Sequence, residues 1–329
     1  MSGGLEVIGE GRSPSAEMTA EPRSRVFVLT DISNEPDDEE SLVRFLVYAN
    51  EYDIEGLVAT TSTHLRNRTR EDLIRRQLAA YGQVRGNLVK HAPGYPTQEQ
   101  LLAVTATGQP AYGMAAVGDG KSSAGSKLLL AAADKADERP LWVSVWGGAN
   151  TLAQALWDAR KERSPDALQK LVAKLRVYTI SDQDDAGRWL RLEFPDLFYI
   201  VSPSSTDWRE YYRATWTGIS GDRHYRNGPS VDFALVDNPW LEENVIKNHG
   251  PLGALYPKLA YIMEGDTPSF LGLIGNGLAW SASPAYGGWG GRYVLYQSYA
   301  ETRPIWTDNL DNRDTVEVEG KLHTSNQAT

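Results

Sequence analysis

The chain of 329 residues contains no cysteine. Disulfide bonds, a thiolate nucleophile and cysteine-bound zinc or iron–sulfur centres are therefore excluded. No apolar run reaches the roughly 18 residues of a transmembrane helix, so we expect no contact with a membrane. Basic residues are also few, with 33 Lys and Arg against 43 Asp and Glu and a net charge of −10. This balance argues against a nucleic-acid partner, because phosphates attract basic surfaces.

The first residues are rich in Gly, Ser, Pro and Glu and lack the apolar core of a signal peptide. We predict a flexible leader over residues 1–24 and a single domain over residues 25–329. The missing signal peptide favours a cytoplasmic location and leaves secretion open. Hydrophobic residues make up 41% of the chain and charged residues 23%, which is ordinary for a globular protein.

The densest pattern in the chain runs from Arg25 to Ala49. Its apolar start, Val26 to Leu29, predicts a buried strand, and apolar residues at helical spacing predict a helix that begins near Asp37 and Asp38. The helix dipole favours acids at a helix start, but it does not account for Asp31, which precedes the turn. Clustered carboxylates are typical ligands of a hard cation such as calcium or magnesium. The stretch therefore predicts a metal site.

Strand patterns alternate with helical patterns along the rest of the chain. This alternation predicts an α/β fold with an open, mostly parallel sheet flanked by helices, Rossmann-like in class. Polar residues follow several predicted strands, at Asp31, Ser62 to His64, Asp182 to Asp185, and Glu264 to Asp266. Because parallel strands end at one edge of a sheet, where ligands bind in such folds, we expect these residues to converge.

Three assignments matter for the comparison with the structure. Asn87 to Ala92 is interpreted as a short strand, and Lys258 to Met263 as a last central strand that leads into Glu264. Residues 276–315 are interpreted as a loop because they are rich in Gly, Pro and Ser. No Gly-x-Gly-x-x-Gly motif follows the first strand, which argues against a dinucleotide-binding enzyme.

Several motifs resemble those of the nucleoside hydrolases. "VFVLTDISNEPDDEESLVRFLVYANEYDIEGLVATTS" resembles the start of that family, whose hallmark is an Asp-rich loop after the first strand, and "WGGANTLAQAL" resembles a later turn. The similarity is greater to the nucleoside hydrolase-like domains labelled cellulose-binding. Their signatures "NEPDD", "EGDTPSF" and "GGWGGRY" stand here at Asn34 to Asp38, Glu264 to Phe270 and Gly287 to Tyr293. The resemblance covers about residues 25–329 and implies a nucleoside hydrolase-like fold.

The resemblance also implies roles for individual residues. Asp31 would bind Ca²⁺ and act as the general base, and Asp38 and Asp266 would be further calcium ligands. Asp37 would contact sugar hydroxyls, and a carbonyl near Asn150 would complete the ligand ring. A metal of this kind lowers the pKa of bound water, and a carboxylate can then take up its proton.

The chain departs from the family pattern at the leaving-group side. Gly265 precedes Asp266, where the family often has a histidine that helps the leaving group depart. We therefore consider two other acids, His64 after the second strand and Glu264 beside Asp266. The alternative for His64 is an ordinary loop histidine.

The family stretch that contacts the primary hydroxyl of the sugar is replaced here by "SDQDDAGRWLRLEFP". Further candidate substrate contacts come from this stretch, from the acidic loop and from the Gly-rich loop near the C-terminus. They are Asn34, Asp182, Asp184, Trp189, Glu193 and Trp289. For Trp289 the alternative is a structural turn, because aromatic side chains more commonly pack than bind sugars.

These inferences together predict a Ca²⁺-dependent hydrolase that cleaves an N- or O-glycosidic bond with a metal-activated water. The alternative is a non-catalytic carbohydrate-binding or repurposed domain that keeps the metal site. In either case the ligand would be a small-molecule glycoside or a saccharide. Whether the protein forms a homo-oligomer, and whether the metal is Ca²⁺ or Mg²⁺, stay open.

Overall fold

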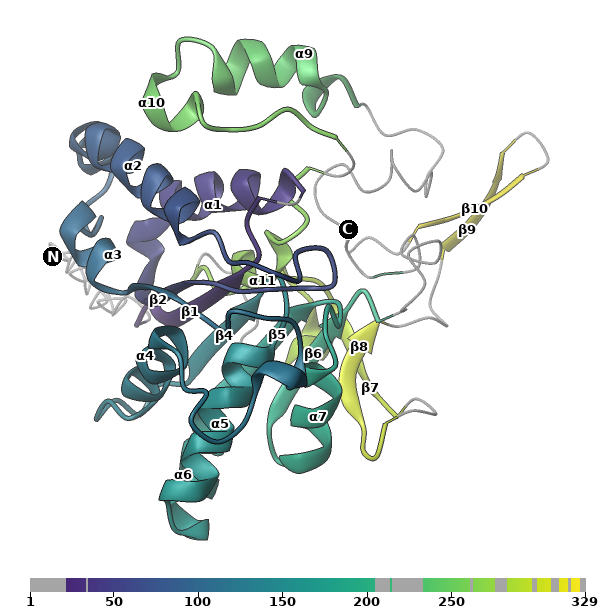
Figure 1. Ribbon diagram of the computed structural model, residues 1–329. Coiled ribbons are helices and arrows are strands. Elements are labelled where there is room, and N and C mark those ends of the chain that lie inside the picture. Colours follow the sequence, from purple (N-terminus) through teal and green to yellow (C-terminus); the bar gives the residue numbers. More distant parts are fainter. Residues whose placement is uncertain are drawn as a thin grey trace, which may run out of the picture.

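A single mixed sheet of eight strands forms the centre of the protein (Figure 1). The computed structural model describes residues 22–33, 35–204, 214, 233–260, 263–275, 283–297, 301–308, 314–318 and 321–325. Most of the predicted leader, residues 1–21, therefore lies outside the described part. The strand order is β3-β2-β1-β4-β5-β6-β8-β7, with all neighbours parallel except the antiparallel pair β7 and β8. The predicted α/β fold is confirmed.

The strands of the sheet share short lengths and apolar sequences. They are β1 (Ser24–Thr30), β2 (Tyr52–Ala59), β3 (Thr105–Thr107), β4 (Leu141–Val145), β5 (Leu175–Ile180), β6 (Phe198–Ser202), β7 (Tyr293–Tyr296) and β8 (Ile305–Asp308). A separate two-stranded hairpin is formed by β9 (Asp314–Val318) and β10 (Lys321–Ser325).

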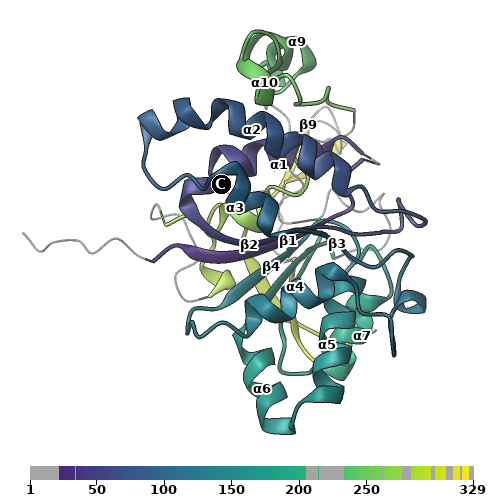
Figure 2. The same ribbon diagram turned by 60° about the vertical axis from the view of Figure 1, so that its left-hand side comes forward.

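Helices cover both faces of the sheet, as Figures 1 and 2 show from two directions. One face carries α1 (Asp37–Val47), α2 (Glu71–His91) and α11 (Pro268–Leu271), and the opposite face carries α4 (Ala124–Ala133), α5 (Asn150–Glu162), α6 (Pro165–Lys174) and α7 (Ala186–Glu193). The remaining short helices are α3 (Gln98–Ala103), α9 (Asn238–Leu241) and α10 (Gly250–Gly253). In the part of the chain that the structure describes, no helix is long and apolar enough to cross a membrane.

Strand β1 lies between the two hydrophobic cores. All of its residues from Arg25 to Thr30 are buried. Val26 and Val28 pack into the core beneath α1 and α2, whereas Phe27 and Leu29 pack into the core on the side of α4 and α5. A strand that is buried on both faces has to be apolar throughout, so polar chemistry can begin only where the strand ends.

The sheet order reverses beside β1. From β1 the chain proceeds to β2 and β3 on one side, and then returns to place β4, β5 and β6 on the other side. Such a reversal opens a crevice beyond the carboxyl ends of the two strands that flank it. Hydrogen bonds extend the ladder to this end, from Thr60 N to Thr30 O at 2.7 Å and from Trp146 N to Leu29 O at 2.7 Å. The crevice therefore lies beyond Thr30, with the ends of β2 and β4 on either side.

Three assignments made from the sequence are wrong. Residues 87–91 are not a strand but the last turns of α2. Lys258 to Met263 does not form a strand in its described residues, 258–260 and 263, so Asp266 reaches the site on a turn before α11. Residues 276–315 are not only loop, because they contain β7 and β8. In each case the local sequence pattern was short, and contacts with distant elements decided the structure.

An aromatic cluster fixes α11 against α1 and the sheet. The ring of Phe45 stacks on Tyr52 with centroids 5.1 Å apart and meets Phe270 edge-on at 5.1 Å. The ring of Trp146 lies 5.8 Å from Phe270. The Tyr52 hydroxyl also donates a hydrogen bond to Phe270 O at 3.0 Å. These rings join α1, β2, β4 and α11 into one packed unit.

We expect Phe270→Ala to lower the free energy of unfolding by about 3–5 kcal/mol, because it removes a ring from the centre of this cluster and leaves a cavity. Urea denaturation would measure the loss. The control is Leu192→Ala on α7, whose side chain is 54% exposed. That change should stay within about 0.5 kcal/mol. Equal effects of the two variants would show that the cluster does not have this structural weight.

Candidate metal and active site

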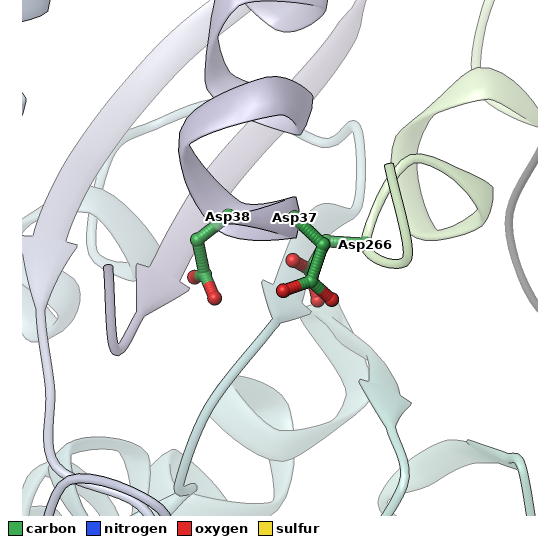
Figure 3. A group of neighbouring side chains, drawn as sticks. All are labelled: Asp37, Asp38 and Asp266. Carbon is green, nitrogen blue, oxygen red and sulfur yellow. The ribbon is translucent and has the colours of Figure 1, made fainter. Parts of the chain in front are cut away.

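Aspartates from three segments of the chain meet at the crevice. Asp31 follows β1 directly, Asp37 and Asp38 form the first turn of α1, and Asp266 lies in the turn before α11. Ligand oxygens of Asp37, Asp38 and Asp266 all lie within 4.8 Å of one another, and Figure 3 shows the two segments that supply them. Asp31, Asp38 and Asp266 are at most 5% exposed. The convergence expected from the sequence is therefore found for these residues.

Burial and mutual repulsion control the charge of these carboxyl groups. Burial raises the pKa of Asp31 from 3.8 to about 6, an effect that the Ser62 hydroxyl and the charge of His64 oppose. Burial, with the charges of Glu35 and Asp31, raises the pKa of Asp37 to about 7. The pKa values of Asp38 and Asp266 are raised well above 3.8 by burial and by the neighbouring aspartates. The charge of Asp31 contributes to all three of these shifts, so it belongs to the same site.

Hydroxyl groups at the strand ends hold two of the carboxylates. The Thr30 hydroxyl donates a hydrogen bond to Asp38 Oδ1. The Ser62 hydroxyl donates to Asp31 Oδ2 at 2.5 Å, and its oxygen accepts hydrogen bonds from the backbone N–H groups of His64 at 2.9 Å and Leu65 at 3.1 Å. Because these two donors fill the lone pairs of Ser62 Oγ, its proton is directed to Asp31. The sequence analysis did not identify these supporting roles of Thr30 and Ser62.

The donor set fits a hard divalent cation. Asp37 Oδ1 and Asp266 Oδ2 are buried and have no hydrogen-bond partner among the described residues. A buried carboxylate oxygen without a partner is destabilising, and a cation that it coordinates would remove this cost. Oxygen donors of this kind are the preferred ligands of Ca²⁺ and Mg²⁺. The structure places Asp37, which was expected to contact the sugar, within the same ligand cluster.

Two glycines bring the turn after β4 against the aspartates. A Cβ atom on Gly147 would lie 2.6 Å from Asp31 Oδ1, and one on Gly148 would collide with Asp184 Oδ2. Only glycine allows such close approach of the backbone. The "WGGAN" motif therefore has a structural reason, because it closes one wall of the crevice around Asp31.

Asn150 and Asp184 stabilise the backbone at this wall. Asp184 accepts hydrogen bonds from the N–H groups of Asn150 at 3.1 Å and Ala186 at 3.0 Å, while burial raises its pKa to about 7. Asn150 Nδ2 donates to Ala111 O at 2.8 Å and Thr61 Oγ1 at 3.2 Å. Its Oδ1 atom is buried and has no partner among the described residues. This oxygen is the part of the Asn150 side chain that remains available as an acceptor.

Other predicted substrate contacts are engaged elsewhere. Asp182 forms a bidentate ion pair with Arg191, with distances of 2.9 and 2.7 Å. Trp189 packs on Trp157, with ring centroids 6.0 Å apart, and Glu193 pairs with Arg160 at 2.7 Å. Trp189 and Glu193 are four residues apart on α7, so both face α5 rather than the aspartates.

The two candidate acids have different environments. Glu264 accepts hydrogen bonds from Arg44 Nη2 at 2.9 Å, from the Tyr256 hydroxyl at 2.9 Å and from Thr267 Oγ1 at 3.0 Å. A general acid has to present a proton to the substrate, whereas Glu264 is the acceptor in all these contacts. His64 is exposed, and its charge acts on Asp31.

Two further candidates lie in loops. Trp289 is 40% exposed in the turn before β7. Asn34 lies outside the described residues.

The fold and site define an α/β protein with a buried carboxylate cluster at the switch point of its sheet. The family model described as "Cellulose-binding Sde182, nucleoside hydrolase-like domain" matches residues 25–293. The chain belongs to this family, as the resemblance in its motifs led us to expect. Among the curated proteins, none matches the chain.

Solved structures show the same likeness. A nucleoside hydrolase-related hypothetical protein from Saccharophagus degradans, described as associated with carbohydrate metabolism, is 41% identical with a TM-score of 0.74. The match covers 88% of this chain and 67% of that one. An inosine-uridine preferring nucleoside hydrolase from Bacillus anthracis is 13% identical, with a TM-score of 0.46 and coverage of 87% and 93%.

The raised pKa values predict how the stability of the metal-free protein depends on pH. A folded-state pKa above the unfolded value gives a contribution that is complete below the unfolded pKa and is lost as the pH rises through the folded pKa. For Asp31 and Asp37 this window runs from 3.8 to about 6 and 7. We therefore expect the melting temperature in EDTA to fall across this range.

Calcium should oppose this loss, because it binds the ionised carboxylates and competes with protons. We expect CaCl₂ to raise the melting temperature more at about pH 8 than at about pH 5. Asp266→Asn, which removes one ligand charge, should reduce the calcium effect. An equal rise at both pH values, or none in the unmodified protein, would contradict this account of the site.

Proposed function

We propose that the protein is a metal-dependent hydrolase that cleaves an N- or O-glycosidic bond in a small glycoside or saccharide, with Ca²⁺ as the cation. The main support is the set of buried aspartates, which come from separate segments and include two oxygens without partners. Chemistry at a buried carboxylate cluster of this kind requires a cation and a polar ligand. Family membership supports the same reaction class.

In this proposal Asp31 is the general base. Its Oδ2 atom accepts the hydrogen bond of Ser62, which fixes the orientation of the carboxylate. The Oδ1 atom faces the turn at Gly147. Asp37, Asp38 and Asp266 would hold the cation, which when bound would lower the pKa of water at the site. Asp31 is then the side chain that takes up the proton of the attacking water.

The same carboxylates also suit the other half of the reaction. Cleavage of a glycosidic bond passes through an oxocarbenium-like transition state, whose positive charge is stabilised by nearby negative groups. Asn150 Oδ1 is an unpartnered buried acceptor suited to a sugar hydroxyl. His64, exposed and close enough for its charge to act on Asp31, is the side chain that we assign to protonation of the leaving group.

A non-catalytic saccharide-binding domain is the second candidate function. Two observations favour it. The family description includes the term cellulose-binding, and Glu264 is held in an ion pair with Arg44 instead of serving as an acid. In that case the cation site would order the binding surface without turnover. Measured saccharide binding by a protein that hydrolyses neither nucleosides nor nitrophenyl glycosides would favour this candidate.

We expect Asp31→Asn to reduce the turnover number by roughly 10²–10⁴-fold, the usual contribution of a general base. The same variant should be at least as stable as the unmodified protein in EDTA, because it removes one of several buried like charges. Assays with purine and pyrimidine nucleosides and with nitrophenyl glycosides would measure turnover, and thermal denaturation would measure stability.

The matched control is Glu55→Gln, which changes a buried acid on β2 that pairs with Arg25 and Lys135. We expect it to lower stability and to leave turnover close to that of the unmodified protein. Full activity of Asp31→Asn would exclude Asp31 as the base.

A further inference from the structure

The turn that carries Asp266 is attached to α1 through Glu264. The Glu264 carboxylate receives the Arg44 guanidinium through Nε and through Nη2, the latter at 2.9 Å, and its side chain is 1% exposed. The Tyr256 hydroxyl and Thr267 Oγ1 donate to the two oxygens of the same carboxylate. This acid is therefore fully occupied by partners, although it lies two residues from a candidate metal ligand.

Further contacts join the same turn to one face of α1. The backbone N–H of Glu264 donates to Glu40 Oε2 at 2.8 Å, and that of Asp266 donates to Ser41 Oγ at 3.3 Å. Glu40, Ser41 and Arg44 are neighbours on a helix surface, because residues three and four apart face the same side. The first turn of α1 supplies Asp37 and Asp38, and its next turn anchors the segment that supplies Asp266.

The backbone of the turn has an uncommon conformation at this point. Glu264 has φ of +55°, in the left-handed region that non-glycine residues rarely adopt. Such a conformation persists where surrounding contacts determine it, and it is often found at functional sites. Here the contacts of the Glu264 side chain and N–H group hold the residue in place.

We propose that Glu264 and Arg44 are positioning residues, which set the distance between Asp266 and the aspartates of α1 and so determine the affinity for the cation. This inference rests on the metal site of the proposed function. It gives Glu264 a role different from that of a leaving-group acid. It also explains why α1 carries a basic residue facing an acidic crevice.

Two competing explanations make the opposite prediction for Arg44. If Glu264 acted through its charge alone, loss of Arg44 would leave a negative charge near the site and strengthen cation binding. If Glu264 were itself a metal ligand, loss of Arg44 would release it and again strengthen binding. Positioning requires that loss of Arg44 weaken binding, because the turn is then free to move Asp266 away from Asp37 and Asp38.

The experiment is calorimetric titration of the full chain with CaCl₂. We expect Arg44→Met to weaken binding by about tenfold or more, and Arg44→Lys to have an intermediate effect, because lysine keeps the charge but not the two-pronged geometry. Glu264→Gln, which is isosteric, should also weaken binding. Urea denaturation of each variant would separate loss of affinity from loss of stability.

The matched control is Arg163→Met. Arg163 forms a bidentate pair with Asp134, with both distances at 2.7 Å, between the ends of α5 and α4. It should lose stability without losing cation affinity. Unchanged or tighter binding by Arg44→Met, with binding by the unmodified protein intact, would overturn the positioning inference alone. Absence of binding by the unmodified protein would overturn the metal site itself and this inference with it. If Arg44→Met does not fold, unchanged affinity of Glu264→Gln has the same negative meaning.

Discussion

The structure depends on keeping several buried like charges close together. Asp31, Asp37, Asp38 and Asp266 repel one another in a crevice where burial already disfavours their ionised forms. Burying an unpaired charge costs on the order of several kcal/mol. Because these residues belong to separate segments, their repulsion acts to push those segments apart. The packing around the crevice has to resist it, and a bound cation would remove the main cause.

Two sets of contacts provide this resistance on the side of α1. The aromatic rings of Phe45, Tyr52, Trp146 and Phe270 bury α11 between the helix and the sheet. The ion pair of Arg44 with Glu264 then fixes the preceding turn. The apolar contacts supply most of the stabilisation but have little directional preference, whereas the ion pair has defined geometry. The location of Asp266 follows from both.

The sequence was most informative where the elements are local. The unit formed by β1, the acidic loop and α1 could be predicted because a short apolar run and a helical pattern meet at the acids. Strands β7 and β8 were not predicted, since Tyr293–Tyr296 and Ile305–Asp308 are short and stand among Gly- and Pro-containing segments. Their structure depends on pairing with each other and with β6, and a single-chain pattern does not contain this information.

The sequence by itself determined the class of fold, the absence of thiol chemistry and the identity of the aspartates beside β1 and in the "EGDTPSF" motif. Only the tertiary structure decided which acids remain available. It joined Asp37 to the metal cluster, and it paired Glu264 with Arg44, 220 residues away. It also turned Trp189 and Glu193 toward α5. The reason is that hydrophobic periodicity is encoded locally, whereas the charge state and accessibility of an acid depend on its partners, which the fold brings together from distant parts of the chain.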